Sequence, residues 1–168
     1  MAIGLLLGTL FAFSDPDPAA KVPEFVIDTR GTNSVTARIE KDQTVFVVMS
    51  ERGIGWADIK LKSGTWPDRI TFRFGYSAEK GFRSLEGFNL TTDQIVVKGS
   101  DKDSGKMLFT FLDANGKPDV TDLRSENAAG KLDVRIEHRD GGLEVILPAR
   151  MLRKSSKLWF GWVDAYRR

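Results

Sequence analysis

The sequence predicts an all-β protein, a single antiparallel β-sandwich of jelly-roll-like type with about ten strands. Short runs of alternating apolar and polar residues recur along the chain, and turn residues separate them. No amphipathic helix of any length interrupts these runs. Many short strands at regular spacing are typical of sandwiches and barrels.

The expected strands follow from a two-residue rhythm, because side chains of a strand point to alternate faces. Between Gly55 and Leu61, apolar residues alternate with Trp56, Asp58 and Lys60. The run TVFVVMS at 44–50 is almost continuously apolar, which indicates a strand buried on both faces. In chain order the expected strands cover 25–28, 35–40, 44–50, 55–61, 70–76, 82–90, 94–98, 106–112, 132–138, 143–147 and 158–166.

Glycine and proline mark the connections between these strands. Arg139-Asp140-Gly141-Gly142 predicts a tight hairpin, since glycine supplies the positive φ of such turns. Trp66-Pro67-Asp68 predicts a corner, because proline fixes its own φ and keeps Trp66 extended. The segment PARMLRK at 148–154 predicts a short turn between the last two strands, and 117–130 a long loop.

Composition excludes several classes of protein. The chain has 168 residues, which suggests one domain. It contains no Cys and one His, His138, so thiolate chemistry and multi-histidine metal sites are excluded. The net charge of +2 is spread along the chain, whereas nucleic-acid binders concentrate basic residues on one face. We therefore expect no nucleic-acid partner, no metal and no cofactor.

The N-terminus predicts export. Residues 1–14 include an uncharged apolar run of twelve residues, Ala2–Phe13, which suits a signal peptide, although no Lys or Arg precedes it. Such a run is too short to span a membrane as a helix. Residues 15–23 are rich in proline and predict an extended linker. The sandwich is expected at 24–168, in a secreted or periplasmic protein without a stable membrane span after processing.

Three short motifs resemble an uncharacterised family of secreted bacterial β-domain proteins of planctomycete type. They are Gly53-Ile54-Gly55 with Ala57, Ile59, Leu61, Gly64 and Trp66-Pro67; Arg73 with Leu85-Glu86-Gly87-Phe88; and Leu147-Pro148, Leu152 and Trp162-Val163-Asp164-Ala165-Tyr166-Arg167. The family's ending reads Trp-Ile-Asp-Phe-Tyr-Arg, from which Val163 and Ala165 depart. The resemblance implies export and a β-fold, and no chemistry.

Three tryptophans are candidate ligand-binding residues. Trp56 and Trp159 alternate with apolar neighbours and are expected on outward faces, while Trp66 stands at the corner. Exposed flat aromatic rings stack on sugar rings. The alternative is that each covers a second sheet or a loop. The Gly-Ile-Gly at 53–55 is expected to serve close packing at a strand entry, since it lacks the rest of a dinucleotide motif.

Arg73 and Asp164 complete the candidate set. Asp164 is able to accept two hydrogen bonds from an arginine such as Arg73, and that pair would lock the final strand in place. The acidic stretches 101–105 and 113–119 hint at calcium, but Asx-type turns explain them better. We expect no catalytic residue.

The expected function is therefore non-catalytic binding or assembly outside the cytoplasm, with a glycan, a cell-surface component or a protein as partner. Two alternatives remain open: a small secreted hydrolase that uses a carboxylate pair, and a structural accessory domain. Two acids about 5–10 Å apart in a cleft, one with a raised pKa, would favour the hydrolase. A flat aromatic strip would favour a binding module.

Overall fold

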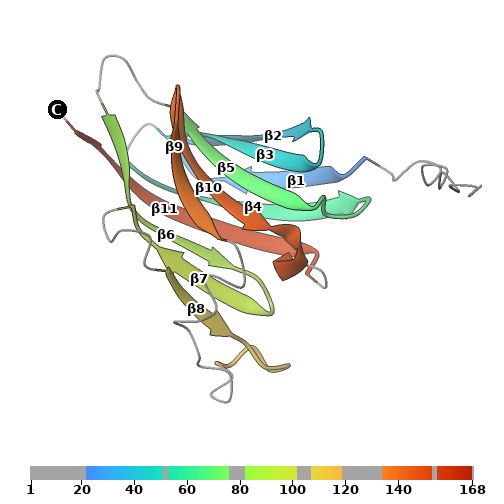
Figure 1. Cartoon of the computed structure of the whole chain (residues 1–168). Helices are drawn as coiled ribbons and strands as arrows, with labels where there is room; N and C mark the ends of the chain where they lie inside the picture. The colour runs from blue at the N-terminus through green and yellow to red at the C-terminus, as the bar shows by residue number, and fades with distance from the viewer. Residues whose placement is uncertain are drawn as a thin grey trace, which may run out of the picture.

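The computed structural model describes residues 22–50, 53–75, 82–101, 107–118, 134–152 and 155–167. These residues form eleven strands and one 3-10 turn, arranged as two sheets packed face to face (Figure 1). Sheet A has six strands in the order β1 (Glu24–Thr29), β4 (Ile54–Ser63), β11 (Lys157–Arg167), β6 (Phe82–Thr91), β7 (Ile95–Gly99) and β8 (Met107–Phe111). Sheet B has five strands in the order β2 (Ser34–Glu40), β3 (Gln43–Met49), β5 (Arg69–Gly75), β10 (Gly142–Pro148) and β9 (Arg135–Arg139).

The predicted all-β sandwich is confirmed. The chain crosses repeatedly between the sheets, and every expected strand has a counterpart in β1 to β11. The turn η2 (Ala149–Leu152) links β10 to β11, where a short turn was expected. The predicted loop at 117–130 lies outside the described residues from 119 onward, and so does the N-terminal segment 1–21.

One strand pairing differs from the expectation. β3 and β5 run parallel, with Phe46 beside Phe72, whereas all the other strand pairs of the described sheets are antiparallel. β4 connects them, and it lies in sheet A. The chain therefore leaves sheet B after β3 and returns in the same direction, a geometry that a tight hairpin cannot make.

Aromatic rings from both sheets form the centre of the core. Phe72 of sheet B stacks on Phe160 of sheet A, with ring centroids 3.7 Å apart and planes inclined by 9°. Trp162, which is 2% exposed, packs against both Phe160 and Phe74. The predicted alternation is confirmed here, because Leu158, Phe160 and Trp162 are buried while Trp159 between them is not.

The Gly-Ile-Gly stretch is scaffolding, as predicted. Gly53 has a φ of +74°, and its carbonyl accepts a hydrogen bond of 2.6 Å from the Asp164 backbone N–H. A Cβ at Gly53 would lie 2.8 Å from the Asp164 carbonyl oxygen, and a Cβ at Gly55 would lie 2.3 Å from the Trp162 ring. Both glycines thus let β4 approach β11 and its core tryptophan closely.

Candidate functional site

The five predicted site residues occupy four separate places. Trp56 and Trp159 lie on the outer face of sheet A, on the paired strands β4 and β11. Trp66 lies at one end of the sandwich, between β4 and β5. Arg73 lies on the outer face of sheet B, and Asp164 is buried. Only the two tryptophans of sheet A come together.

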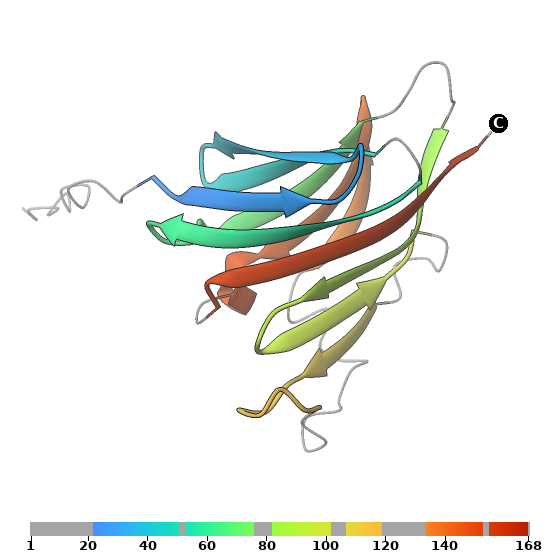
Figure 2. The ribbon, with the colours of Figure 1, turned by 180° about the vertical axis from the view of Figure 1, so that it is seen from behind.

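Strand register places the two tryptophans side by side. Trp56 lies opposite Gly161, and Trp159 lies opposite Asp58, so the tryptophans are diagonal neighbours. Ile54 and Val163 form the next pair along the same two strands. In Figure 2 sheet A faces the viewer, and no described element crosses in front of its central strands. We call Ile54, Trp56, Trp159, Gly161 and Val163 the tryptophan platform.

The ring of Trp159 lies over Gly161. A Cβ on Gly161 would come within 2.3 Å of Trp159 Cη2, 2.8 Å of Cζ3 and 3.0 Å of Cζ2. These three atoms form the far end of the indole, so the Trp159 side chain extends along its strand and covers Gly161. Trp159 is nevertheless 36% exposed, so part of the side chain is open to solvent. The absence of a side chain at position 161 thus leaves room for the ring above this position.

An open apolar depression with a volume of about 390 Å³ lies at the platform. Ile54 is 63% exposed and Val163 43% exposed, so both present apolar surface to solvent on this face of the sheet. The glycines 87 and 161 contribute to its lining, together with Asn89. The volume falls within the range of about 300–1,000 Å³ that is typical of ligand sites.

Polar side chains border the platform in register. Asp58 and Thr91 flank Trp159 on its two neighbouring strands, and Asn89 lies opposite Gly161. Thr91 Oγ1 donates a hydrogen bond of 3.2 Å to Asn89 Oδ1, which leaves the Asn89 amide N–H groups to face outward partners. On the next strand of the sheet, β7, Lys98 lies opposite Asn89. A flat apolar surface is therefore edged by a carboxylate, a hydroxyl and an amide.

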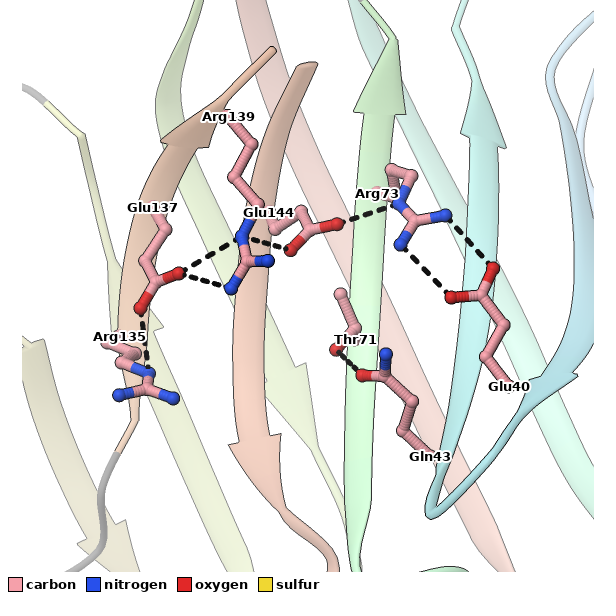
Figure 3. A network of polar contacts seen from close by, with 8 residues as sticks. All are labelled: Glu40, Gln43, Thr71, Arg73, Arg135, Glu137, Arg139 and Glu144. Carbon is pink, nitrogen blue, oxygen red and sulfur yellow. Dashed lines mark hydrogen bonds and ion pairs between the residues drawn. The ribbon is translucent and has the colours of Figure 1, made fainter. Parts of the chain in front are cut away.

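Arg73 belongs to an ion-pair network on the opposite outer face, and the predicted pairing of Arg73 with Asp164 is wrong. Arg73 Nε donates to Glu144 at 2.7 Å, and its terminal nitrogens donate to Glu40 at 3.1 and 3.3 Å (Figure 3). Glu144 also pairs with Arg139, which in turn pairs with Glu137. Because Arg73 points away from the core on sheet B, it cannot reach the last strand of sheet A.

The network is structural. The hydrogen bonds that Arg73 donates, first to Glu40 and then to Glu144, raise its pKa, and the hydrogen bond that Arg139 donates lowers the pKa of Glu137. Beside this network, three neighbouring residues on β3, β5 and β10 also lie on the outer face of sheet B: Val45, Thr71 and Ile146. All three are buried. Long charged side chains that lie along a sheet can cover apolar surface of this kind.

Asp164 and Trp66 also serve the fold. Asp164 is buried beside Ser50, whose hydroxyl donates to Asp164 Oδ1 at 3.2 Å. It follows the bulge at Val163/Asp164, where the register between β11 and β6 shifts. The Trp66 indole N–H donates to the Ser155 carbonyl at 2.8 Å, and its ring packs on Phe25 with centroids 5.3 Å apart. Trp66 also lines a cavity of about 560 Å³.

The remaining sequence features have structural roles. His138 Nε2 lies 3.0 Å from Asp101 Oδ1, which connects β9 of sheet B to the end of β7 in sheet A. Asp113 Oδ1 accepts backbone hydrogen bonds from Asn115 and Lys117, so the predicted Asx turn is confirmed there. Residues 102–106 lie outside the described part of the chain. Among the described residues, no group of three or more potential ligand side chains is arranged to hold a metal ion.

Sequence reasoning missed six residues of this surface: Ile54, Asp58, Asn89, Thr91, Gly161 and Val163. Alternation predicts the outward direction of Asn89, because Phe88 and Leu90 on either side are buried. It does not predict that β6 and β4 flank β11, which is what gathers these residues around Trp159.

No family model, curated protein or solved structure matches this chain. Among the described residues, no helix has the length and hydrophobicity needed to cross a membrane.

Proposed function

We propose that this protein is an exported, non-catalytic glycan-binding domain whose tryptophan platform on sheet A holds the flat face of sugar rings. The single observation that carries the proposal is the Trp159 ring, which covers Gly161, is partly open to solvent and lies beside Trp56. Its partner would be a polysaccharide of the cell surface or matrix, in a secreted or periplasmic setting.

The chemistry of the platform fits a sugar ring. The C–H face of a pyranose is apolar and packs on an aromatic face, while its hydroxyl groups lie at the edge and need polar partners. Trp159 supplies the flat face, and Asp58, Thr91 and Asn89 stand at its borders in register. A carboxylate, a hydroxyl and an amide together offer both donors and acceptors to such hydroxyl groups.

The positions of the acids favour binding over hydrolysis. A glycosidase needs two carboxyl groups that flank the scissile bond. Asp58 lies opposite Trp159, and Asp28 lies opposite Asp58 on the next strand, so both acids lie on the same side of β11, on β4 and β1. The glutamates of sheet B are ion-paired with arginines. We therefore assign no catalytic role.

Export is part of the proposal and is supported by the apolar segment Ala2–Phe13, the proline-rich residues 15–23 and the resemblance to secreted planctomycete-type β-domain proteins. That resemblance includes Trp162-Val163-Asp164, in which Val163 belongs to the platform and the bulge of β11 lies between Val163 and Asp164.

The test is a depletion assay with a panel of insoluble and soluble polysaccharides, which compares the purified protein with Trp159→Ala and Trp56→Ala. Leu108→Ala is the matched control, because Leu108 is an exposed apolar residue on β8 of the same sheet, away from the platform. We expect each tryptophan variant to lose at least about tenfold in affinity, since buried tryptophan contacts dominate binding sites. The proposal fails if no polysaccharide binds, or if the control loses as much affinity as the tryptophan variants.

A further inference from the structure

A second candidate site lies at the end of the sandwich where β4 and β10 end and β5 and β11 begin. It is a cavity of about 560 Å³. Its lining comes from two connections, the β4–β5 corner and the segment around η2, and consists of Leu61, Gly64, Thr65, Trp66, Pro67, Asp68, Pro148, Ala149, Ser155 and Ser156. None of these residues belongs to the tryptophan platform.

Hydrogen bonds between the two connections hold the walls of this cavity in place. The Trp66 indole N–H donates to the Ser155 carbonyl at 2.8 Å, and the Ala149 N–H donates to the Asp68 carbonyl at 2.9 Å. The Leu61 N–H donates to the Ser156 carbonyl at 2.9 Å. A site whose walls are already fixed loses little conformational entropy when a ligand binds.

The lining of the cavity combines one aromatic residue, Trp66, with exposed polar side chains. The indole N–H of Trp66 is already engaged and the ring packs on Phe25, so Trp66 offers a ligand only ring surface. Thr65, Asp68 and Ser156 are exposed, and their side chains make no hydrogen bond or ion pair within the described part of the chain. Ser155 is different, because its buried hydroxyl donates to Asp93 Oδ1.

We propose that this cavity is a second binding site that accepts a single pyranose residue, either free or at the end of a glycan chain. An aromatic wall with one carboxylate and two hydroxyl groups matches the C–H face and the hydroxyl edge of such a ring. Among the described lining residues the one charged side chain is the carboxylate of Asp68. The site uses other elements than the platform and does not depend on it.

The test is a titration of the ¹⁵N-labelled protein with methyl glycosides of common hexoses and pentoses. We expect at least one glycoside to shift the backbone amide resonances of Thr65, Asp68 and Ser156. Asp68→Asn should weaken this binding about tenfold or more, because hydrogen bonds to a charged group are the strong ones. The matched control is Asp42→Asn, an exposed acid at the β2–β3 turn, and it should bind as the unmodified protein does.

Trp66→Phe is a second variant that keeps a ring to pack on Phe25, so a loss of binding can be separated from unfolding by thermal melts. Absence of any shift with every glycoside, shifts confined to the platform, or equal affinity in Asp68→Asn would each overturn the proposal. Shifts at the cavity without any polysaccharide binding would support the cavity proposal and contradict the proposed glycan binding by the platform.

Discussion

Replacing Gly161 and Gly55 by alanine, one at a time, distinguishes the outer face of sheet A from its core face. A Cβ at Gly161 would lie 2.3 Å from Trp159 Cη2. A Cβ at Gly55 would lie 2.3 Å from Trp162 Cζ2 and 2.6 Å from Asn33 Nδ2. The two substitutions are chemically identical and create equally severe overlaps with a tryptophan ring. They differ in whether that ring has somewhere to move, and in the further overlap of a Cβ at Gly55 with Asn33.

The two stability changes should therefore differ. Trp159 is 36% exposed and can turn into solvent, at about 0.5–1.5 kcal/mol for an unfavourable rotamer. Alanine also restricts the unfolded chain more than glycine does, which stabilises the folded protein by about 0.4–1 kcal/mol. The free energy of unfolding of Gly161→Ala should therefore stay within about 1 kcal/mol of that of the unmodified protein. Trp162 and Asn33 are buried, and overpacking costs about 1–3 kcal/mol, so Gly55→Ala should lose about 1–2 kcal/mol net.

Urea denaturation, followed by circular dichroism, measures both free energies of unfolding. The expected result is a clear loss of stability for Gly55→Ala and almost none for Gly161→Ala. Gly161→Ala should nonetheless lose polysaccharide binding, because a side chain at position 161 displaces the Trp159 ring. Equal losses in the two variants would refute the reasoning, since they would mean that Trp159 is as confined as Trp162.

Three further perturbations test other parts of the structure. Phe160→Ala should lower the free energy of unfolding by about 3–5 kcal/mol, because its ring joins the two sheets through Phe72; a loss under about 1 kcal/mol in a urea melt would contradict this packing. Glu144→Gln should lose about 1–2 kcal/mol, since this nearly buried carboxylate holds Arg73, and equal melts at low salt would contradict it. The lowered pKa of Glu137 stabilises the fold above the ordinary glutamate pKa, and this contribution is lost as the pH falls through the folded pKa. Stability should thus drop below about pH 5 less steeply in Glu137→Gln than in the unmodified protein, and parallel pH profiles would show that the pair has no such effect.

Alternation along the sequence was sufficient to predict the strands and which way their side chains face. Trp159 points outward because Leu158 and Phe160 on either side point inward, and both are fully buried. The same rule explains Trp56 beside Ala57. A strand can be predicted locally, because the side chains of neighbouring residues alternate between its two faces.

Pairing between distant strands could not be predicted in this way. Gly161 and Trp56 are adjacent in sheet A although far apart in the chain, and no local pattern identifies that register. The error over Arg73 has the same origin. Alternation correctly placed both Arg73 and Asp164 on strands. These strands belong to different sheets, and Arg73 pairs with Glu40 and Glu144 of its own sheet instead.

The most direct test of the glycan platform is an NMR titration of the four tryptophan indole N–H resonances with a soluble fragment of the polysaccharide that binds. We predict that the Trp56 and Trp159 resonances shift with one common saturation curve, while Trp162, enclosed by the core, does not move. Saturable binding that leaves both platform resonances unchanged would contradict the proposal.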